Sequence, residues 1–123
     1  MIKSINPVTN KIIKTYRPFS DKKILSIVDS VSLEFEKWKF LSYDNRSKTL
    51  YNIANDLKSN IEEHAQMISM EMGKPIAESR MEIDKCVWVL KYFADNASNF
   101  LKNREIKTEY SESYILLKKT DTK

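Results

Sequence analysis

The stretch that decides the fold is Glu71-Met72-Gly73-Lys74-Pro75-Ile76-Ala77-Glu78, which ends one amphipathic helix and begins the next. Gly73 is the only glycine in the 123 residues. Glycine suits the position just past a helix end because it adopts a positive φ without steric cost. Pro75 cannot continue the first helix but fits the first turn of another. We therefore expect two helices to meet here at a tight turn.

Apolar residues recur at helical spacing on both sides of this turn. Ser20 is suited to cap a first helix that reaches about Lys39, and Ser42 or Asp44 to cap a long second helix that continues to Gly73. A third helix is expected from Pro75 to about Leu101. The three apolar stripes are Ile24, Ile27, Val28, Val31, Phe35 and Trp38; Leu50, Ile53, Ala54, Leu57, Ile61, Ala65, Ile68 and Met72; and Ile83, Val87, Leu90, Ala94, Ala97 and Leu101.

Short β segments flank the three helices. Residues 2–18 predict two strands joined by a turn at Thr9-Asn10-Lys11, and residues 107–110 and 113–117 predict a second strand pair. The expected fold class is mainly α with small β pieces: an N-terminal β-ribbon, three helices and a C-terminal strand pair. Residues 118–123 are polar and aperiodic, so we expect them to form a disordered tail after a folded unit of residues 1–117.

The expected third helix carries a second apolar row beside its stripe. This row consists of Cys86, Val89, Phe93 and Phe100, and Trp88 and Tyr92 lie beside it. A helix that is apolar around most of its circumference is usually buried on several sides. Two other helices and a small ribbon offer limited cover, so we expect further protein to pack against this helix.

Composition sets the broad class of the chain. Hydrophobic residues make up 41% and charged residues 31%, which is ordinary for a globular protein of one domain. No apolar run approaches the roughly 20 residues that cross a bilayer, and the N-terminus has no apolar stretch of the signal-peptide type. We expect a cytoplasmic protein without membrane partners.

Most recognisable cofactor sites are disfavoured by residue counts alone. One cysteine, Cys86, cannot form an internal disulfide, and one histidine, His64, cannot complete a zinc site with it. A single glycine excludes a glycine-rich phosphate loop. The net charge is +4, and basic residues mostly alternate with acidic ones, whereas a nucleic-acid surface would cluster them. We expect no nucleic-acid partner.

Several motifs, in order along the chain, resemble the start of the aldehyde dehydrogenase superfamily, and most closely its succinate-semialdehyde dehydrogenase branch. They are Ile5-Asn6-Pro7-Val8-Thr9-Asn10, Phe35-Glu36-Lys37-Trp38, Arg46 followed by Leu50 to Leu57, Glu71-Met72-Gly73-Lys74-Pro75 with Glu78, Glu82 and Lys85-Cys86, Tyr92-Phe93-Ala94-Asp95-Asn96-Ala97, and Ser113-Tyr114-Ile115. Asn10 departs from the pattern, because glycine is usual there. The resemblance covers roughly residues 2–117.

The resemblance implies oxidation of succinate semialdehyde or a similar small aldehyde to the acid, with NAD or NADP as cofactor. In that chemistry a thiolate attacks the aldehyde, hydride passes to the cofactor and the thioester is hydrolysed. The family's catalytic and cofactor-binding residues come later in its sequence, so none maps onto this chain. We therefore expect residues 1–117 to be an incomplete N-terminal part that buttresses a cofactor domain and is inactive alone. Its partners would be the missing C-terminal half or further copies of itself.

Individual residues are assigned structural roles. Cys86 is expected to be a buried packing residue rather than the nucleophile, and His64 an exposed helical residue rather than a base. Glu78 and Glu82 are one helical turn apart, and such a pair of carboxylates can serve in acid–base catalysis. We expect instead that both face water, with Glu82 near Lys85.

Other residues are placed by charge or by the resemblance. Lys74 suits the negative pole of the helix end, where it could contact a carbonyl. By resemblance, Met81, Lys85 and Trp88 would lie beside a substrate entrance. The alternative function for the whole chain is a helical protein-interaction module without catalysis, with the apolar rows of the third helix as its partner surface.

Overall fold

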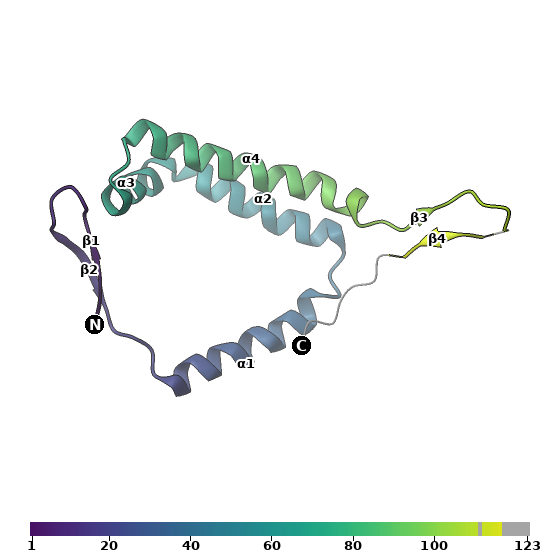
Figure 1. The fold of residues 1–123 in the computed structure, drawn as a ribbon, viewed down its shortest axis with the longest axis horizontal. Coiled ribbons are helices and arrows are strands. Elements are labelled where there is room, and N and C mark those ends of the chain that lie inside the picture. Colours follow the sequence, from purple (N-terminus) through teal and green to yellow (C-terminus); the bar gives the residue numbers. More distant parts are fainter. Residues whose placement is uncertain (111, 117–123) are drawn as a thin grey trace.

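The computed structural model describes residues 1–110 and 112–116, so the expected disordered tail, residues 118–123, lies outside the described residues. The strands are β1 (Ile2–Ile5), β2 (Ile12–Tyr16), β3 (Arg104–Glu105) and β4 (Tyr114–Ile115), and the helices are α1 (Asp21–Trp38), α2 (Tyr43–Ser59), α3 (Ile61–Met72) and α4 (Ile76–Phe100). The β1–β2 ribbon comes before the helices and the β3–β4 pair after them (Figure 1). The predicted class, mainly α with small β pieces, is confirmed.

Hydroxyl side chains begin α1 and α2. The Ser20 hydroxyl accepts a hydrogen bond from the Lys23 N–H at 3.3 Å, and the Ser42 hydroxyl accepts one from the Asn45 N–H at 3.3 Å. Each hydroxyl thereby satisfies a backbone donor that has no partner within its own helix. Of the two predicted caps for the second helix, Ser42 is therefore the one used.

The long second helix expected up to Gly73 is wrong, because Asn60 divides it into α2 and α3. Asn60 has φ −107° and ψ 26°, and its side-chain amide donates to the Asp56 backbone oxygen at 3.1 Å. Asparagine competes with the helix through such local bonds. The apolar rhythm continues on both sides of Asn60, so periodicity did not reveal the break.

The turn at Gly73 is confirmed and also anchors the N-terminal ribbon. Gly73 has φ 71° and its N–H donates to the Ser69 oxygen at 3.0 Å, which closes α3. Pro75 is the N-cap of α4, one position before the predicted first turn. A Cβ placed on Gly73 would lie 3.1 Å from Pro7 Cγ, so the ribbon turn packs directly on the helix junction. The Ser4 hydroxyl adds a 2.7 Å bond to Glu71 Oε1.

The core lies along α4, which runs back antiparallel to α3 and then to α2 (Figure 1). Its buried members are Ala54, Ile83 and Val87, with Leu57, Ile61, Ile68 and Leu90 packed around them. Ala65 and Ala94 are also buried, and these small side chains let the helix backbones approach closely. The stripe predicted for the third helix is thus confirmed at Ile83, Val87 and Ala94.

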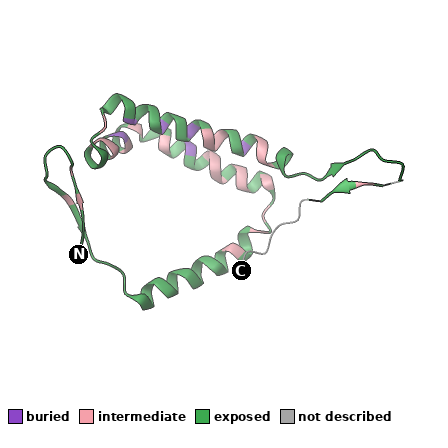
Figure 2. Cartoon of the chain, viewed as in Figure 1, coloured by how far each residue is buried: buried purple, intermediate pink, exposed green. Residues whose placement is uncertain are grey.

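The first helix has no such packing. No residue of α1 is buried, and the helix lies apart from α2 and α4 (Figures 1 and 2). Among the described residues, the elements with close mutual contacts are α2, α3 and α4 and the two strand pairs. The helical core is therefore a hairpin of α2–α3 against α4.

The C-terminal strand pair is confirmed only in part. Tyr114 and Ile115 pair antiparallel with Glu105 and Arg104, whereas residues 107–110, which were expected to form the partner strand, are irregular. The Thr108 hydroxyl accepts from the Tyr110 N–H and also contacts the Ser113 hydroxyl. Such local bonds compete with strand pairing, so the first strand forms earlier in the sequence.

Candidate functional site

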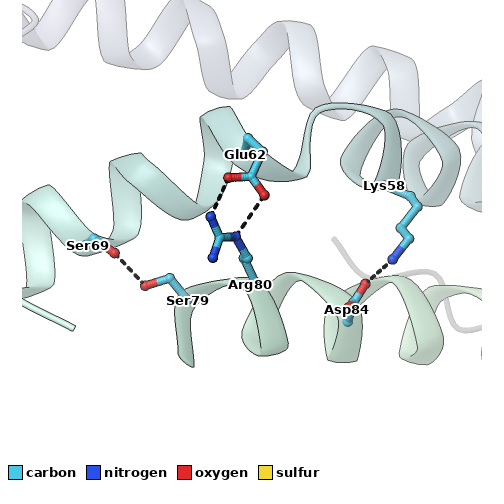
Figure 3. A network of polar contacts seen from close by, with 6 residues as sticks. All are labelled: Lys58, Glu62, Ser69, Ser79, Arg80 and Asp84. Carbon is cyan, nitrogen blue, oxygen red and sulfur yellow. Dashed lines mark hydrogen bonds and ion pairs between the residues drawn. The ribbon is translucent and has the colours of Figure 1, made fainter. Parts of the chain in front are cut away.

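Figure 3 shows three of the polar contacts that join α4 to α2 and α3. The Arg80 guanidinium donates to both Glu62 carboxylate oxygens at 2.8 Å, and Lys58 pairs with Asp84 at 2.6 Å. Between α3 and α4 the Ser69 and Ser79 hydroxyls lie 2.9 Å apart. The two ion pairs are exposed, and exposed pairs stabilise a fold by little. Their arrangement sets the register of the helices rather than building a reactive centre.

Arg80 and Glu62 change one another's proton affinity. The hydrogen bonds from Arg80 hold the pKa of the Glu62 carboxyl below its ordinary value, and the same pair raises the pKa of Arg80. Both groups therefore stay charged at neutral pH, as an ion pair requires. Neither is tuned toward the neutral pKa that a general acid or base needs.

Ser79 is fully buried, and sequence reasoning missed it. Its position, four residues before Ile83 and eight before Val87, places it on the buried stripe of α4. A polar residue at a core position was the signal, because a buried hydroxyl needs a partner. Ser69 on α3 supplies that partner, so Ser79 is structural.

Arg46 builds a corner between α1 and α2. Its guanidinium carbon lies 5.8 Å from the centre of the Trp38 ring and 5.6 Å from that of Tyr43. Its Nη2 donates to the Lys39 backbone oxygen at 2.9 Å, at the end of α1. A planar guanidinium can satisfy a carbonyl and stack on rings together, which lysine cannot do. We refer to Arg46, Trp38, Lys39 and Tyr43 as the Arg46 corner.

The far end of the hairpin is held by two hydroxyls of α2. Ser47 donates to the Ala94 backbone oxygen at 2.6 Å, and the Tyr51 hydroxyl donates to Asp95 Oδ1. The bond to Asp95 raises the pKa of Tyr51, because the carboxylate favours the protonated phenol. Tyr51 is therefore a donor in the folded chain and not a base at neutral pH.

Cys86 does not have the buried position that was predicted. It lies exposed on α4, because α2 and α3 cover the side of α4 that carries Ile83 and Val87 and leave the second apolar row open. In the described part of the chain its sulfur makes no hydrogen bond that would pair it with a base. A nucleophilic thiolate needs such an activating partner. Cys86 is thus an accessible thiol with no base bonded to it in the described residues.

The remaining candidate residues lie on α3, on α4 and in the connection between them. His64 is half-buried instead of exposed, and its Nε2 is buried with no hydrogen-bond partner among the described residues. Glu82, which was expected near Lys85, forms its ion pair with Lys74 of the α3–α4 connection, so the ammonium group of Lys74 contacts this carboxylate instead of the expected carbonyl. Glu78 is exposed, as expected.

Met81, Lys85 and Trp88 share the outer side of α4, away from α2 and α3. Their spacing of four and three residues places them on one helix face, where Met81 is 70% and Trp88 64% exposed. The Trp88 ring stacks on Tyr92 with centroids 5.7 Å apart. The structure therefore brings these residues together on an open surface, and their predicted place beside a substrate entrance stays a prediction.

The described residues contain no group of three or more histidine, cysteine, aspartate or glutamate side chains that could hold a metal ion. The surroundings of Gly73, the one glycine of the sequence, are occupied by the ribbon turn, because a Cβ placed on it would lie 3.1 Å from Pro7 Cγ and 3.6 Å from Val8 Cγ2. An open depression of about 490 Å³ lies along the C-terminal strand pair. It is lined by Asn103, Glu105, Glu112, Ser113, Tyr114 and Leu116.

Across residues 1–110 and 112–116, no helix combines the length and apolar character needed to span a bilayer.

The chain resembles known enzymes over nearly its whole length. Residues 1–120 match the model of the aldehyde dehydrogenase family. A probable NADP⁺ succinate-semialdehyde dehydrogenase of Synechocystis sp. is 29% identical over 114 residues, which are 93% of this chain and 25% of that protein. An NAD(P)⁺ succinate semialdehyde dehydrogenase of Escherichia coli is 30% identical over 112 residues, or 91% of this chain and 24% of that protein.

The fold agrees with the same family. The crystal structure of succinic semialdehyde dehydrogenase from Streptococcus pyogenes, in complex with NADP⁺, matches with a TM-score of 0.84 and 27% identity. The match covers 93% of this chain and 25% of that one, so the chain spans about a quarter of the length of its relatives. With the family model matched over residues 1–120, the chain belongs to the aldehyde dehydrogenase family.

Proposed function

We propose that this chain is the N-terminal part of an NAD(P)-dependent aldehyde dehydrogenase, located in the cytoplasm, that oxidises succinate semialdehyde or a similar small aldehyde. The observation that supports this proposal most strongly is the structural match to the Streptococcus pyogenes enzyme, which covers 93% of the chain at a TM-score of 0.84. The relatives from Synechocystis and Escherichia coli, whose names specify the same aldehyde, support the substrate class.

We further propose that the chain is catalytically inactive alone. Aldehyde oxidation through a thioester needs a nucleophile activated by a base and a dinucleotide held beside it. Cys86 is exposed on α4 without a base bonded to it, and the only glycine is enclosed by Pro7 and Val8. The role of α2, α3 and α4 would then be to support the rest of the enzyme.

The experiment begins with the coding DNA beyond Lys123, read in all three frames. A downstream segment that encodes the rest of a dehydrogenase is joined to this chain in one reading frame. We expect the joined protein to reduce NAD⁺ or NADP⁺ with succinate semialdehyde, and this chain alone to reduce neither. A control reaction without aldehyde measures background reduction.

Two results would contradict the proposal. The first is aldehyde-dependent reduction by the isolated chain, which would place a catalytic centre in these 123 residues. The second is a downstream sequence that encodes no dehydrogenase, or a joined enzyme that prefers a bulky aromatic aldehyde to succinate semialdehyde.

A second candidate function is a helical interaction module without catalysis. The observation that favours it is the exposed apolar surface of α1 and of the outer side of α4. A module should be a well-behaved monomer or closed oligomer by itself, whereas a part of a larger fold should be prone to aggregation until it is completed. Light scattering of the purified chain separates these two behaviours.

A further inference from the structure

The N-terminal ribbon carries the whole net charge of the chain. Residues 1–20 contain four cationic side chains and no acidic one; these ribbon cations are Lys3, Lys11, Lys14 and Arg17. The rest of the sequence has equal numbers of basic and acidic residues, so the net charge of +4 belongs to these first 20 residues. All four ribbon cations are exposed. The ribbon is therefore a small cationic surface on an otherwise neutral protein.

The ribbon cations are not neutralised by the chain itself. Among the described residues, no acidic side chain forms an ion pair with any of them. The ammonium group of Lys14 lies 5.4 Å from the centre of the Tyr16 ring, which leaves its charge in place. On the helices, by contrast, Lys58 pairs with Asp84 at 2.6 Å. A cluster of unpaired cations attracts an anionic partner across about 8–10 Å at moderate salt.

The register of the ribbon decides which of its faces is open. The Ser4 hydroxyl bonds to Glu71 of α3, so the face that carries Ser4 is turned toward the helices (Figure 1). Successive side chains of a strand point to opposite faces, and residues directly opposite one another share a face. Lys3 and its partner Thr15 therefore lie on the face turned away from α3. Ile5 and its partner Ile12 share that face, so the outer ribbon face consists of Lys3, Ile5, Ile12 and Thr15.

The outer ribbon face combines cationic charge with exposed aliphatic side chains. Ile5 is 46% and Ile12 53% exposed. Aliphatic side chains neither stack on nucleic-acid bases nor hydrogen-bond to their edges, so they do not favour a nucleic acid as the anionic partner. They do gain free energy at the boundary between the headgroups and the acyl chains of a bilayer. The combination therefore favours an anionic lipid surface.

The helix junction holds the ribbon in a fixed position. Pro7 and Val8 rest against Gly73, where a Cβ would lie 3.1 Å and 3.6 Å from their side chains. The bond from Ser4 to Glu71, at 2.7 Å, adds a second point of attachment. A surface that is already ordered loses little conformational entropy when it binds.

We propose that the ribbon cations and the outer ribbon face form a peripheral binding surface for a bilayer that contains anionic phospholipids. The cations contact lipid phosphates, and Ile5 and Ile12 enter the interfacial region. The expectation of a protein without membrane partners followed from the lack of a membrane-crossing run, and a surface association needs no such run. The cytoplasmic leaflet presents anionic lipids, so the proposed location in the cytoplasm is compatible with this partner. The proposal goes beyond the proposed function and does not depend on the aldehyde that is oxidised.

Flotation of the purified chain with lipid vesicles tests the surface, because vesicle-bound protein floats whereas aggregates sediment. One set of vesicles contains phosphatidylcholine with about one third phosphatidylglycerol, and the other contains phosphatidylcholine alone. The neutral vesicles measure any binding through the exposed apolar side chains of α1 and α4. We expect the anionic vesicles to bind at least about tenfold more tightly, and this difference to disappear in about 1 M salt, where the screening length is about 3 Å.

Two matched double variants test the position of the charge. Lys3→Gln with Lys11→Gln removes two ribbon cations, and Lys48→Gln with Lys102→Gln removes two exposed lysines from α2 and from the segment after α4. A cation close to an anionic bilayer strengthens binding by about fivefold, so the ribbon variant should bind about 25-fold more weakly and the control variant by less than about threefold. Lys3→Arg with Lys11→Arg should retain the binding of the parent chain, because the charge is kept.

The aliphatic side chains distinguish a lipid surface from other polyanions. Ile12→Ser should weaken binding to the anionic vesicles by about fivefold or more, because it removes apolar area from the interfacial region. Equal losses in the two glutamine variants, equal binding to the two kinds of vesicle, or unchanged vesicle binding by Ile12→Ser would each overturn the proposal. Tighter binding to a DNA duplex than to the anionic vesicles at the same salt concentration would also overturn it and would assign the ribbon cations to nucleic acid.

Discussion

Replacing Gly73 by alanine tests the helix junction, because the backbone conformation and the space at this residue both oppose a side chain. The φ of Gly73 is 71°, in the left-handed region, where an ordinary L-residue costs about 1–2 kcal/mol. The new Cβ would also lie 3.1 Å from Pro7 Cγ, so the ribbon turn would have to shift by a few tenths of an ångström. Against this, alanine restricts the unfolded chain and returns about 0.4–1 kcal/mol.

The net expected loss of unfolding free energy is about 1 kcal/mol, which is the difference between these opposing effects. For a domain of this size that loss lowers the melting temperature by about 4–8 °C. The assay is thermal unfolding of the purified chain followed by far-ultraviolet circular dichroism. Gly73→Asn is the matched control, because asparagine adds a Cβ but enters the left-handed region more readily, so its fall should be smaller.

A melting temperature of Gly73→Ala equal to or above that of the parent chain would refute this reasoning. It would mean that Gly73 does not hold a positive φ in solution, or that the ribbon does not rest against it. A fall in Gly73→Asn as large as that in Gly73→Ala would instead assign the loss to crowding by Pro7.

Three further predictions concern the core, the thiol and the ion pair. Ile83→Ala should lower the unfolding free energy measured by urea titration by about 2–4 kcal/mol, because Ile83 is buried. Val31→Ala, at an exposed position, should change it by less than about 0.5 kcal/mol. Equal losses in the two variants would contradict the assigned core. Cys86 should react with a maleimide in the folded chain within about tenfold of its rate in urea, and strong protection would contradict its exposure. The folded pKa of Glu62 is lowered by Arg80, so the pair's contribution is present above the unfolded pKa of about 4.3 and is lost as pH falls through the folded value. Acidification from pH 7 to about 3 should therefore destabilise the parent more than Glu62→Gln, and equal pH profiles would show that the pair does not form in solution.

Residues with a strong preference for helix ends predicted where several of the helices begin or end. Gly73 and Pro75 fixed the turn between α3 and α4, and Ser20 and Ser42 fixed the starts of α1 and α2. The Asn60 break was missed because the apolar rhythm passes through it unchanged. At the break the side-chain amide of Asn60 donates to the Asp56 backbone oxygen, and apolar periodicity gives no sign of such a local bond.

Contacts between residues of different elements were harder to predict from the sequence. Lys85 is three residues from Glu82 in sequence, yet Glu82 pairs with Lys74, because the tight turn at Gly73 returns the chain beside α4. Cys86 lies on an apolar row, but burial depends on what faces that row, and α2 and α3 face another side of α4. Arg46 was recognised through the family resemblance, whereas its contacts with Trp38 and Tyr43 needed the structure.

The central claim is that α2, α3 and α4 form a core of their own, whereas α1 has no packing partner among the described residues. Amide hydrogen exchange of the isolated chain, measured residue by residue, tests this claim most directly. The account predicts the slowest exchange around Ala54, Ile83 and Val87, and exchange in α1 close to that of an unprotected helix. Protection of α1 equal to that of α4 would contradict it, because α1 would then have its packing partner within this chain.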